Sequence, residues 1–373
     1  MGLISTQALI DPVETFVHIG LVIYGSLQTR SGGYLYDQKL VEFLNQKGDR
    51  VTIVSIRHQD YLHHLGDNFS TALVNCLREL PLDILLQDEL NHPSLFWLNR
   101  RLRKVAAYPF VTIVHHLRTC EPFPAWQKII YRWVEGKYLT SVDAFVYNSR
   151  ATQQSVQSLV RINRPELVAY PAGDRFKPHI SDDQIRIRAH AAGPLRLVFL
   201  GNLIPRKNLH VLLKALSGLA LGSWHLIVVG NIDIDPAYTF RVSRQIEEDG
   251  IAQQVQFLGS ISDQRLAGIL ESSHVLAIPS SYEGYGIAYL EGMGFGLPAL
   301  GSAAGGAQEI IQHGKNGFLI QPGDSESLTT CLLQLTQNRV LLTEMGIAAK
   351  NRYLTHPNWA TTANRIREFL NTL

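Results

Sequence analysis

Short runs of apolar and β-branched residues alternate with segments of helical periodicity along the whole chain. This alternation is typical of βαβ units and predicts parallel sheets in an α/β fold. The strands expected in the first half are Phe16–Tyr24, Arg50–Ile56, Asp83–Gln87, Phe110–Val114, Ala144–Tyr147 and Leu167–Tyr170. Those expected in the second half are Leu195–Leu200, Trp224–Val229, Val255–Leu258, Val275–Ile278, Ala299–Gly301 and Gly317–Ile320. Each half therefore has enough strands for a sheet of its own.

A polar stretch separates the two halves. Residues Phe176–Asp183 are mostly polar, and Ala191–Pro194 comes directly before a strong strand. Such segments are typical of linkers, so we place the domain boundary here. We expect one domain over residues 1–178 and a second over residues 179–357.

Composition narrows the class of protein. With 373 residues and 46% hydrophobic composition, the chain can form a buried core in each domain. The 34 basic and 32 acidic residues are too evenly balanced for a general nucleic-acid binder. The three cysteines, Cys76, Cys120 and Cys331, are too far apart to indicate a disulfide framework or a zinc site.

The same features favour a cytoplasmic location. No apolar run reaches the roughly 20 residues that a spanning helix needs. The segment Met1–Gly20 lacks the basic and apolar regions of a secretory leader. We therefore expect a protein that is neither secreted nor integral to a membrane.

The sharpest motif is a strand, turn and helix over Pro279–Glu291. Ligands of α/β sheets bind where strands end, and a helix start offers unpaired backbone N–H groups and a positive dipole end. The N–H groups of Gly286, Ile287 and Ala288 are therefore expected to hold a diphosphate without a metal ion.

Two acids bracket this anion site. Glu283 precedes the helix and Glu291 lies about one turn inside it. Eight residues of mixed turn and helix span about 12 Å, which is the scale of a hexose, diphosphate and ribose unit. For an isolated pair, two surface acids would be the simpler interpretation.

Further blocks follow this motif: Gly305–Ile311, Gly314–Leu319 and Pro322–Asp324. Together they strongly resemble glycosyltransferase family four, whose members have the GT-B fold of two Rossmann-like domains facing a cleft. The resemblance implies a retaining glycosyltransferase that uses a nucleotide sugar.

The resemblance also implies roles for individual residues of the motif. Glu291 would accept hydrogen bonds from the ribose hydroxyls, and Glu283 would face the donor hexose. Tyr285, in the turn between them, is assigned to the same donor site. The additional blocks favour these roles over two surface acids.

A second turn, Leu200–Asn208, places two adjacent cations after a strand. Cations in such a place lower the barrier to departure of a diphosphate by electrostatic stabilisation. Arg206 and Lys207 resemble the phosphate clamp of the family, and a solvated basic turn is the alternative. The family often has Arg where this chain has Asn202, so the clamp is assigned to Arg206 and Lys207 alone.

The N-terminal half is expected to supply the acceptor side. Arg30–Tyr34 is predicted as a loop in which Gly32 and Gly33 let the backbone approach a phosphate or sugar. Adjacent strand residues point to opposite faces, so His115 and His116 cannot easily share a metal ion. The resemblance assigns His115 to the donor sugar near the reaction centre and leaves His116 as structural.

Two further assignments come from the resemblance. The turn Gly259–Ile261 is similar to the base-binding turn of the family, which would place uracil near Ile261. The final segment, 358–373, has the pattern of one amphipathic helix. In the family this helix crosses back to the first domain, and we expect the same here.

Two segments carry competing interpretations. Asp233 and Asp235 form an Asp-x-Asp pair that could hold a divalent ion, but Pro236 follows, so we interpret Asp235 as a helix N-cap. Residues Phe123–Lys137 form an aromatic and basic helix that suits either a protein core or contact with an anionic membrane surface.

The predicted reaction moves a hexose from a UDP-sugar, with UDP-glucose as the expected donor, to a saccharide or lipid-linked saccharide, as in bacterial polysaccharide synthesis. We expect no metal, no cofactor and no nucleic-acid partner. A GT-B-fold UDP-sugar epimerase is one alternative. A sugar-nucleotide-binding protein without activity is another, because Asn202 stands where a cation is expected.

Overall fold

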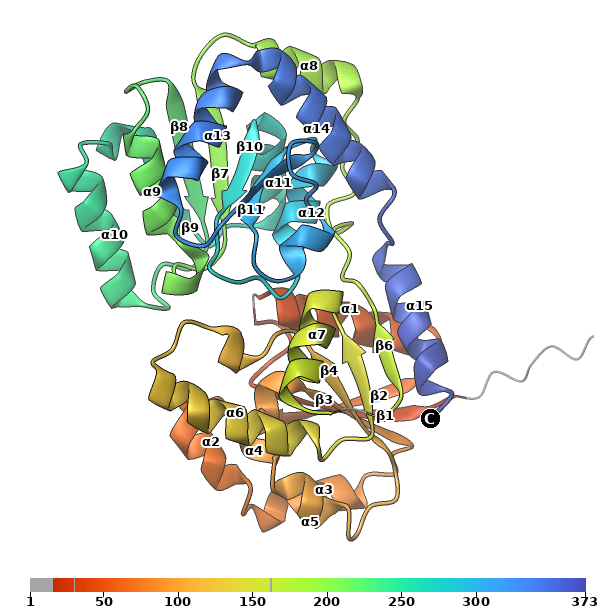
Figure 1. Cartoon of the computed structure of the whole chain (residues 1–373). Helices are drawn as coiled ribbons and strands as arrows, with labels where there is room; N and C mark the ends of the chain where they lie inside the picture. The colour runs from red at the N-terminus through yellow and green to blue at the C-terminus, as the bar shows by residue number, and fades with distance from the viewer. Residues whose placement is uncertain (1–15, 30, 162) are drawn as a thin grey trace, which may run out of the picture.

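The chain forms two α/β domains, one above the other in Figure 1, each built on a parallel sheet of six strands. This computed structural model describes residues 16–29, 31–161 and 163–373. Most of Met1–Gly20, the segment inspected for a leader, lies outside these residues. Within them, no helix combines the length and the apolar character needed to cross a membrane.

The first sheet has the order β2-β1-β3-β4-β5-β6, and every neighbouring pair is parallel. Its strands are β1 (His18–Tyr24), β2 (Arg50–Ile56), β3 (Ile84–Asp88), β4 (Phe110–Val114), β5 (Ala144–Tyr147) and β6 (Glu166–Val168). The direction of winding reverses between β1 and β3. Ligands of open α/β sheets bind at the carboxyl ends of strands beside such a reversal.

The second sheet has the order β12-β11-β10-β7-β8-β9, again all parallel. Its strands are β7 (Leu195–Leu200), β8 (Trp224–Val229), β9 (Val255–Gly259), β10 (Val275–Ile278), β11 (Ala299–Ser302) and β12 (Gly317–Ile320). Here the reversal lies between β7 and β10. The two turns singled out in the sequence follow these two strands.

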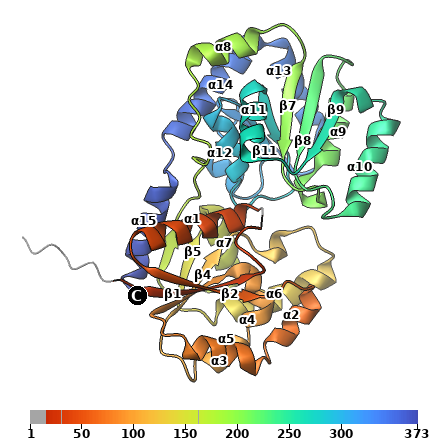
Figure 2. The same cartoon turned by 180° about the vertical axis from the view of Figure 1, so that it is seen from behind.

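Helices cover both faces of each sheet (Figures 1 and 2). Those between the strands of the first half are α1 (Gly32–Gln46), α2 (Tyr61–Asp67), α3 (Thr71–Glu79), α4 (His92–Leu95), α5 (Leu98–Leu102), α6 (Ala125–Leu139) and α7 (Arg150–Leu159). Those that follow are α8 (Asp182–His190), α9 (Leu209–Ser217), α10 (Pro236–Glu248), α11 (Asp263–Ser272), α12 (Ile287–Gly294), α13 (Ser325–Gln337), α14 (Arg339–Leu354) and α15 (Trp359–Leu370). Short 3₁₀ turns lie at Glu89–Asn91, Arg118–Cys120, Pro205–Lys207, Ala252–Gln254 and Gly306–Glu309.

The strand predictions agree with the structure to within two residues at either end. Two predictions of irregular structure are wrong. Gly32 and Gly33 do not lie in a loop but open α1, because the Ser31 hydroxyl accepts a hydrogen bond from Tyr34 N–H and caps the helix. The predicted linker contains α8, which starts with a reciprocal capping box between Ser181 and Gln184.

The final helix, α15, packs on the first domain. Trp359, Ala363, Ile366 and Leu370 of α15 share a buried cluster with Leu40 and its neighbours on α1. Figures 1 and 2 show α15 running from the second domain down along α1. The chain therefore passes between the domains twice, once after β6 and once before α15.

Candidate active site

A cavity of about 1040 Å³ lies between the domains and is lined by residues of both. Every residue predicted for catalysis or donor binding contributes to its lining: Gly32, Gly33, His115, Arg206, Lys207, Ile261, Glu283, Tyr285, Gly286, Ile287, Ala288 and Glu291. The volume is at the upper end of that of small-molecule sites, about 300–1,000 Å³. The fold thus brings together residues that are up to 259 positions apart, the separation of Gly32 and Glu291.

The predicted clamp and the first acid of the motif form one ionic cluster. Lys207 Nζ lies 2.6 Å from Glu283 Oε1, and the Ser280 hydroxyl donates to the same oxygen at 2.6 Å. Burial opposes ionisation of Glu283, but Lys207 and then Arg206 outweigh it and lower the pKa of Glu283 to about 2. The carboxylate is therefore charged throughout the physiological range.

Arg206 is held by both domains. Its Nη1 donates to the Tyr282 carbonyl at 2.9 Å, and its Nε lies 3.6 Å from Glu121 Oε1 of the first domain. His116 Nε2 lies 2.9 Å from the same Glu121 oxygen. Glu121 was not predicted from the sequence, because no motif includes it. His116 was expected to be structural, although its ring also lines the cavity.

Helix α12 directs its N-terminus at the cavity. Gly286 precedes it with φ of 102°, a left-handed conformation that favours glycine, and an added Cβ would lie 2.4 Å from the Tyr289 ring. No described side chain caps this helix. Its first N–H groups are thus placed to bind an anion, as the sequence predicts.

Glu291 is paired with a residue that sequence reasoning missed. Arg175, from the segment that connects the two sheets, contacts both carboxylate oxygens, with Nε at 2.9 Å from Oε1 and Nη2 at 3.2 Å from Oε2. Burial raises the pKa of Glu291 to about 7, and Arg175 opposes this rise. Arg175 also reaches Asp263 at 3.4 Å.

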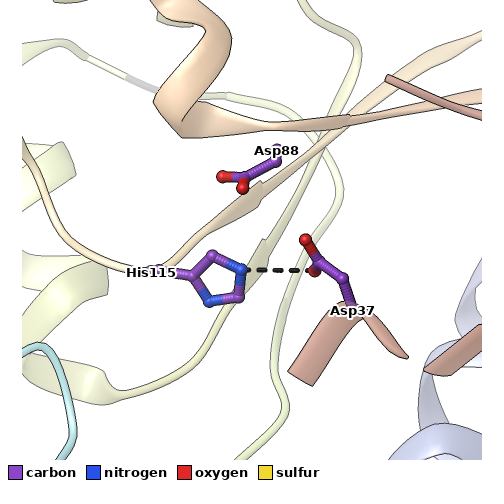
Figure 3. Close-up of side chains that lie close together, drawn as sticks. All are labelled: Asp37, Asp88 and His115. Carbon is purple, nitrogen blue, oxygen red and sulfur yellow. Dashed lines mark hydrogen bonds and ion pairs between the residues drawn. The ribbon is translucent and has the colours of Figure 1, made fainter. Parts of the chain in front are cut away.

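On the opposite wall, His115 follows β4 and its Nε2 lies 3.2 Å from Asp37 Oδ1 of α1 (Figure 3). Asp88, the last residue of β3, lies beside this pair. Both acids were missed by sequence reasoning. One signal was available for Asp88, because it ends a buried strand beside the reversal of the first sheet.

Direct contacts hold the two domains together beside the cavity. The Ser149 hydroxyl donates to the Gly284 carbonyl at 2.7 Å. The carboxylate of Glu309 accepts from the N–H groups of Arg150 and Ala151 at 3.1 and 2.9 Å, and so caps α7 from the other domain. Glu309 belongs to the block that follows the main motif in the sequence.

Of the two interpretations of the Asp-x-Asp pair, a metal site and a helix cap, the structure supports the helix cap. Asp235 Oδ1 accepts from Tyr238 N–H at 2.9 Å, and Pro236 is the first residue of α10. The prediction of an N-cap is therefore confirmed. Neither Asp233 nor Asp235 lines the cavity between the domains.

Comparison with known proteins places this site in a family. The model of the family "Glycosyl transferases group 1" matches residues 181–371, slightly more than half of the chain. The chain belongs to the group 1 glycosyl transferases. The resemblance to family four is consistent with this assignment, and the protein is a glycosyltransferase that binds a nucleotide sugar and an acceptor.

Relatives of this glycosyltransferase match either nearly the whole chain or about half of it. A phosphatidyl-myo-inositol mannosyltransferase of Mycobacterium leprae is 27% identical, over 96% of this chain and 97% of the relative. A GDP-mannose-dependent phosphatidylinositol monomannoside mannosyltransferase of Mycolicibacterium smegmatis is 29% identical, over 53% of each chain.

Solved structures confirm the GT-B fold of the glycosyltransferase. A sucrose-phosphate synthase of Thermosynechococcus elongatus superposes with a TM-score of 0.82 at 18% identity, covering 95% of this chain and 98% of that one. HepE of Anabaena, solved with UDP and glucose, has a TM-score of 0.75 at 20% identity, covering 96% and 100%. At these identities the likeness concerns the fold alone.

Proposed function

We propose that this glycosyltransferase moves a hexose from a UDP-sugar to a hydroxyl of a saccharide or lipid-linked saccharide, with retention of the anomeric configuration and without a metal ion. One observation carries the proposal: Arg206, Lys207, Glu283 and the N-terminus of α12 meet in a single cavity. Two cations and a helix start are enough to bind a diphosphate electrostatically.

The same groups suggest how the reaction proceeds. When the bond between the anomeric carbon and the diphosphate breaks, its electron pair stays on the phosphate oxygen. Arg206, Lys207 and the N–H groups of α12 stabilise this charge. The sugar becomes oxocarbenium-like, and the acceptor hydroxyl attacks it and passes its proton to the departing diphosphate oxygen. Glu283, charged and 2.6 Å from Lys207, would accept hydrogen bonds from hydroxyls of the hexose.

Two donors are candidates. UDP-glucose is the donor expected from the motifs, with the base near Ile261, which lines the cavity together with Ser260 and Ser262. GDP-mannose is the second candidate. Relatives that match this chain over about half of their own length are named as GDP-mannose-dependent enzymes. In both cases Glu291 would hold the ribose.

The acceptor proposal includes contact with a membrane surface. The relative that matches along its whole length is named for a phosphatidyl-myo-inositol substrate. In this chain, α6 exposes Trp126, Ile129, Ile130 and Trp133 by 62%, 70%, 46% and 56%. The exposed Arg132 lies among them. An exposed apolar face with a cation suits the interface of an anionic bilayer, where a lipid-linked acceptor would lie.

The experiment is a transfer assay with UDP-glucose, UDP-galactose, UDP-N-acetylglucosamine and GDP-mannose, and lipid-linked saccharide acceptors, with ¹H NMR of the product. The proposal predicts UDP release from a UDP-hexose and a hexosylated acceptor whose new bond has the same anomeric configuration as the donor. An inverted product would contradict it. Conversion of UDP-sugar without release of UDP would indicate an epimerase, and binding without turnover an inactive sugar-nucleotide-binding protein.

A further inference from the structure

Two buried aspartates lie beside His115, and the reaction proposed above gives neither of them a part. Asp37 comes from α1, Asp88 ends β3 and His115 follows β4, so three separate elements bring them together (Figure 3). One side-chain oxygen or nitrogen of each lies within 4.8 Å of the others. His115 is the member of the group that lines the donor cavity.

The cluster contains more negative than positive charge. Asp37 is 0% exposed, Asp88 1% and His115 7%. One oxygen of each aspartate, Oδ2 in both cases, has no hydrogen-bond partner among the described residues. A buried carboxylate costs several kcal/mol of stability unless a positive charge or hydrogen bonds compensate it. A protonated His115 is the group in contact with Asp37 that can provide this charge.

The pKa shifts of the cluster residues agree with this arrangement of charges. Burial alone would lower the pKa of His115, but Asp37, followed by Asp88 and Glu89, outweighs burial and raises it to about 9. Burial lowers the pKa of the next residue, His116, and the positive charges of Arg206 and His115 add to this fall. Burial raises the pKa of Asp88 to about 7, and Asp37 adds to this rise. Asp88 is therefore the member that takes up a proton as the pH falls, while His115 keeps its own.

The ring of His115 is also fixed in place. A Cβ at Gly33 would lie 3.1 Å from His115 Cδ2, so the glycine allows the start of α1 to lie against the ring. The Tyr36 ring meets it edge-on, with centroids 5.3 Å apart. The hydrogen bond to Asp37 then sets which ring nitrogen faces the acid.

We propose that Asp37 and Asp88 are positioning residues that hold His115 as an imidazolium in the wall of the donor cavity. This inference rests on the proposed function, in which His115 acts on the donor. With Nε2–H directed to Asp37, the charged ring has a second donor at Nδ1–H. A neutral ring with the same bond would present a lone pair there instead. Only the imidazolium can donate to a donor-sugar or phosphate oxygen that gains negative charge.

The direct test is the titration of His115 by long-range ¹H–¹⁵N NMR on the full chain with ¹⁵N-labelled histidine, assigned by comparison with His115→Gln. Wild-type His115 is expected to stay an imidazolium through neutral pH, and its pKa to lie near 9. Asp37→Asn should lower this pKa by about two units, and Asp88→Asn should lower it by less. Asp49→Asn, a buried aspartate paired with Arg367 of α15, is the matched control and should not move it.

Kinetics separate positioning from a merely structural role. In Asp37→Asn, kcat for nucleotide release should fall about tenfold at about pH 8 and recover toward the wild-type value at about pH 6, where the ring regains its proton. An equal loss at every pH, or a neutral His115 at pH 7 in the wild type, would overturn the proposal. If Asp37→Asn does not fold, the titration of His115 in Asp88→Asn tests the proposal: a lowered pKa of His115 supports it, and an unchanged pKa contradicts it. If the wild type transfers no sugar, the proposed function fails while the NMR titration still tests the cluster.

Discussion

Lys207 Nζ lies 2.6 Å from Glu283 Oε1, so the cation predicted to hold the leaving diphosphate is also the partner of the acid predicted to face the hexose. Arg206 Nη1 lies farther away, 3.9 Å from Glu283 Oε2. A bound diphosphate would compete with Glu283 for Lys207, because both are anions. Donor binding would then free the Glu283 carboxylate to accept from hexose hydroxyls.

Lys207→Met should destabilise the protein, because it leaves Glu283 buried without its closest cation. We expect a loss of about 3 kcal/mol in the free energy of unfolding at pH 7, measured by urea denaturation. The pKa of Glu283 is lowered from 4.5 to about 2, so the stability from this pair is present above pH 4.5 and is lost as the pH falls toward 2. The difference between wild type and variant should therefore shrink over the same window.

The double variant Lys207→Met/Glu283→Gln is the control for this pair. Removing both charges should restore most of the stability but none of the activity, because the clamp stays incomplete. Stability that does not recover would mean that Glu283 is not the partner that makes Lys207 important.

Arg175→Ala should weaken donor binding through Glu291. Without Arg175 the pKa of Glu291 would rise above about 7, leaving the carboxyl neutral at pH 7 and a weaker acceptor for ribose hydroxyls. We expect KM for the donor to rise about tenfold at pH 7 and less at higher pH, where Glu291 ionises. Asp263→Asn removes the other partner of Arg175 and a negative charge that raises the pKa of Glu291, so it should leave KM unchanged or slightly lower. An equal effect of both variants would argue against the role of the Glu291 contact.

Glu309→Gln should weaken the contact between the domains. Its carboxylate caps α7 from the other domain, and a cap contributes about 1 kcal/mol. We expect kcat/KM to fall about fivefold, with donor affinity measured by calorimetry unchanged. Asp324→Ala removes a cap within the second domain, on α13, and should leave kcat/KM unaltered. Equal losses of kcat/KM in the two variants would mean that Glu309 only stabilises α7.

The double variant Trp126→Ala/Trp133→Ala should bind vesicles of phosphatidylglycerol at least about tenfold more weakly in co-sedimentation, because both rings are more than half exposed on α6. Phe240→Ala, which removes a ring that is 71% exposed on α10 of the other domain, is the control. Vesicle binding that is equal in all three proteins would contradict a membrane-facing α6.

Local patterns predicted the sheets well, because each buried parallel strand is a short apolar run that a glycine or polar turn ends. Phe110–Val114 and Trp224–Val229 are observed with the predicted bounds. The glycine pair was misjudged because Ser31 caps α1 directly before it, so that two residues typical of turns start a helix. A cap that lies outside an expected helix is easily read as part of a loop.

The motif residues of the site could be found from the sequence because they follow strands that end at the cavity. The residues that pair with them could not be found in this way. Asp37, Glu121 and Arg175 meet His115, Arg206 and Glu291 only through the packing of elements distant in the chain. Pairing of this kind depends on the arrangement of the domains, which no local spacing records.

The most direct test of the account is nucleotide release from UDP- and GDP-sugars with EDTA present, for wild type, Glu283→Ala and Arg206→Ala. We predict turnover that survives EDTA and falls at least about 100-fold in both variants. Turnover that EDTA abolishes, or that either variant retains, would contradict a metal-independent site built on Glu283 and Arg206.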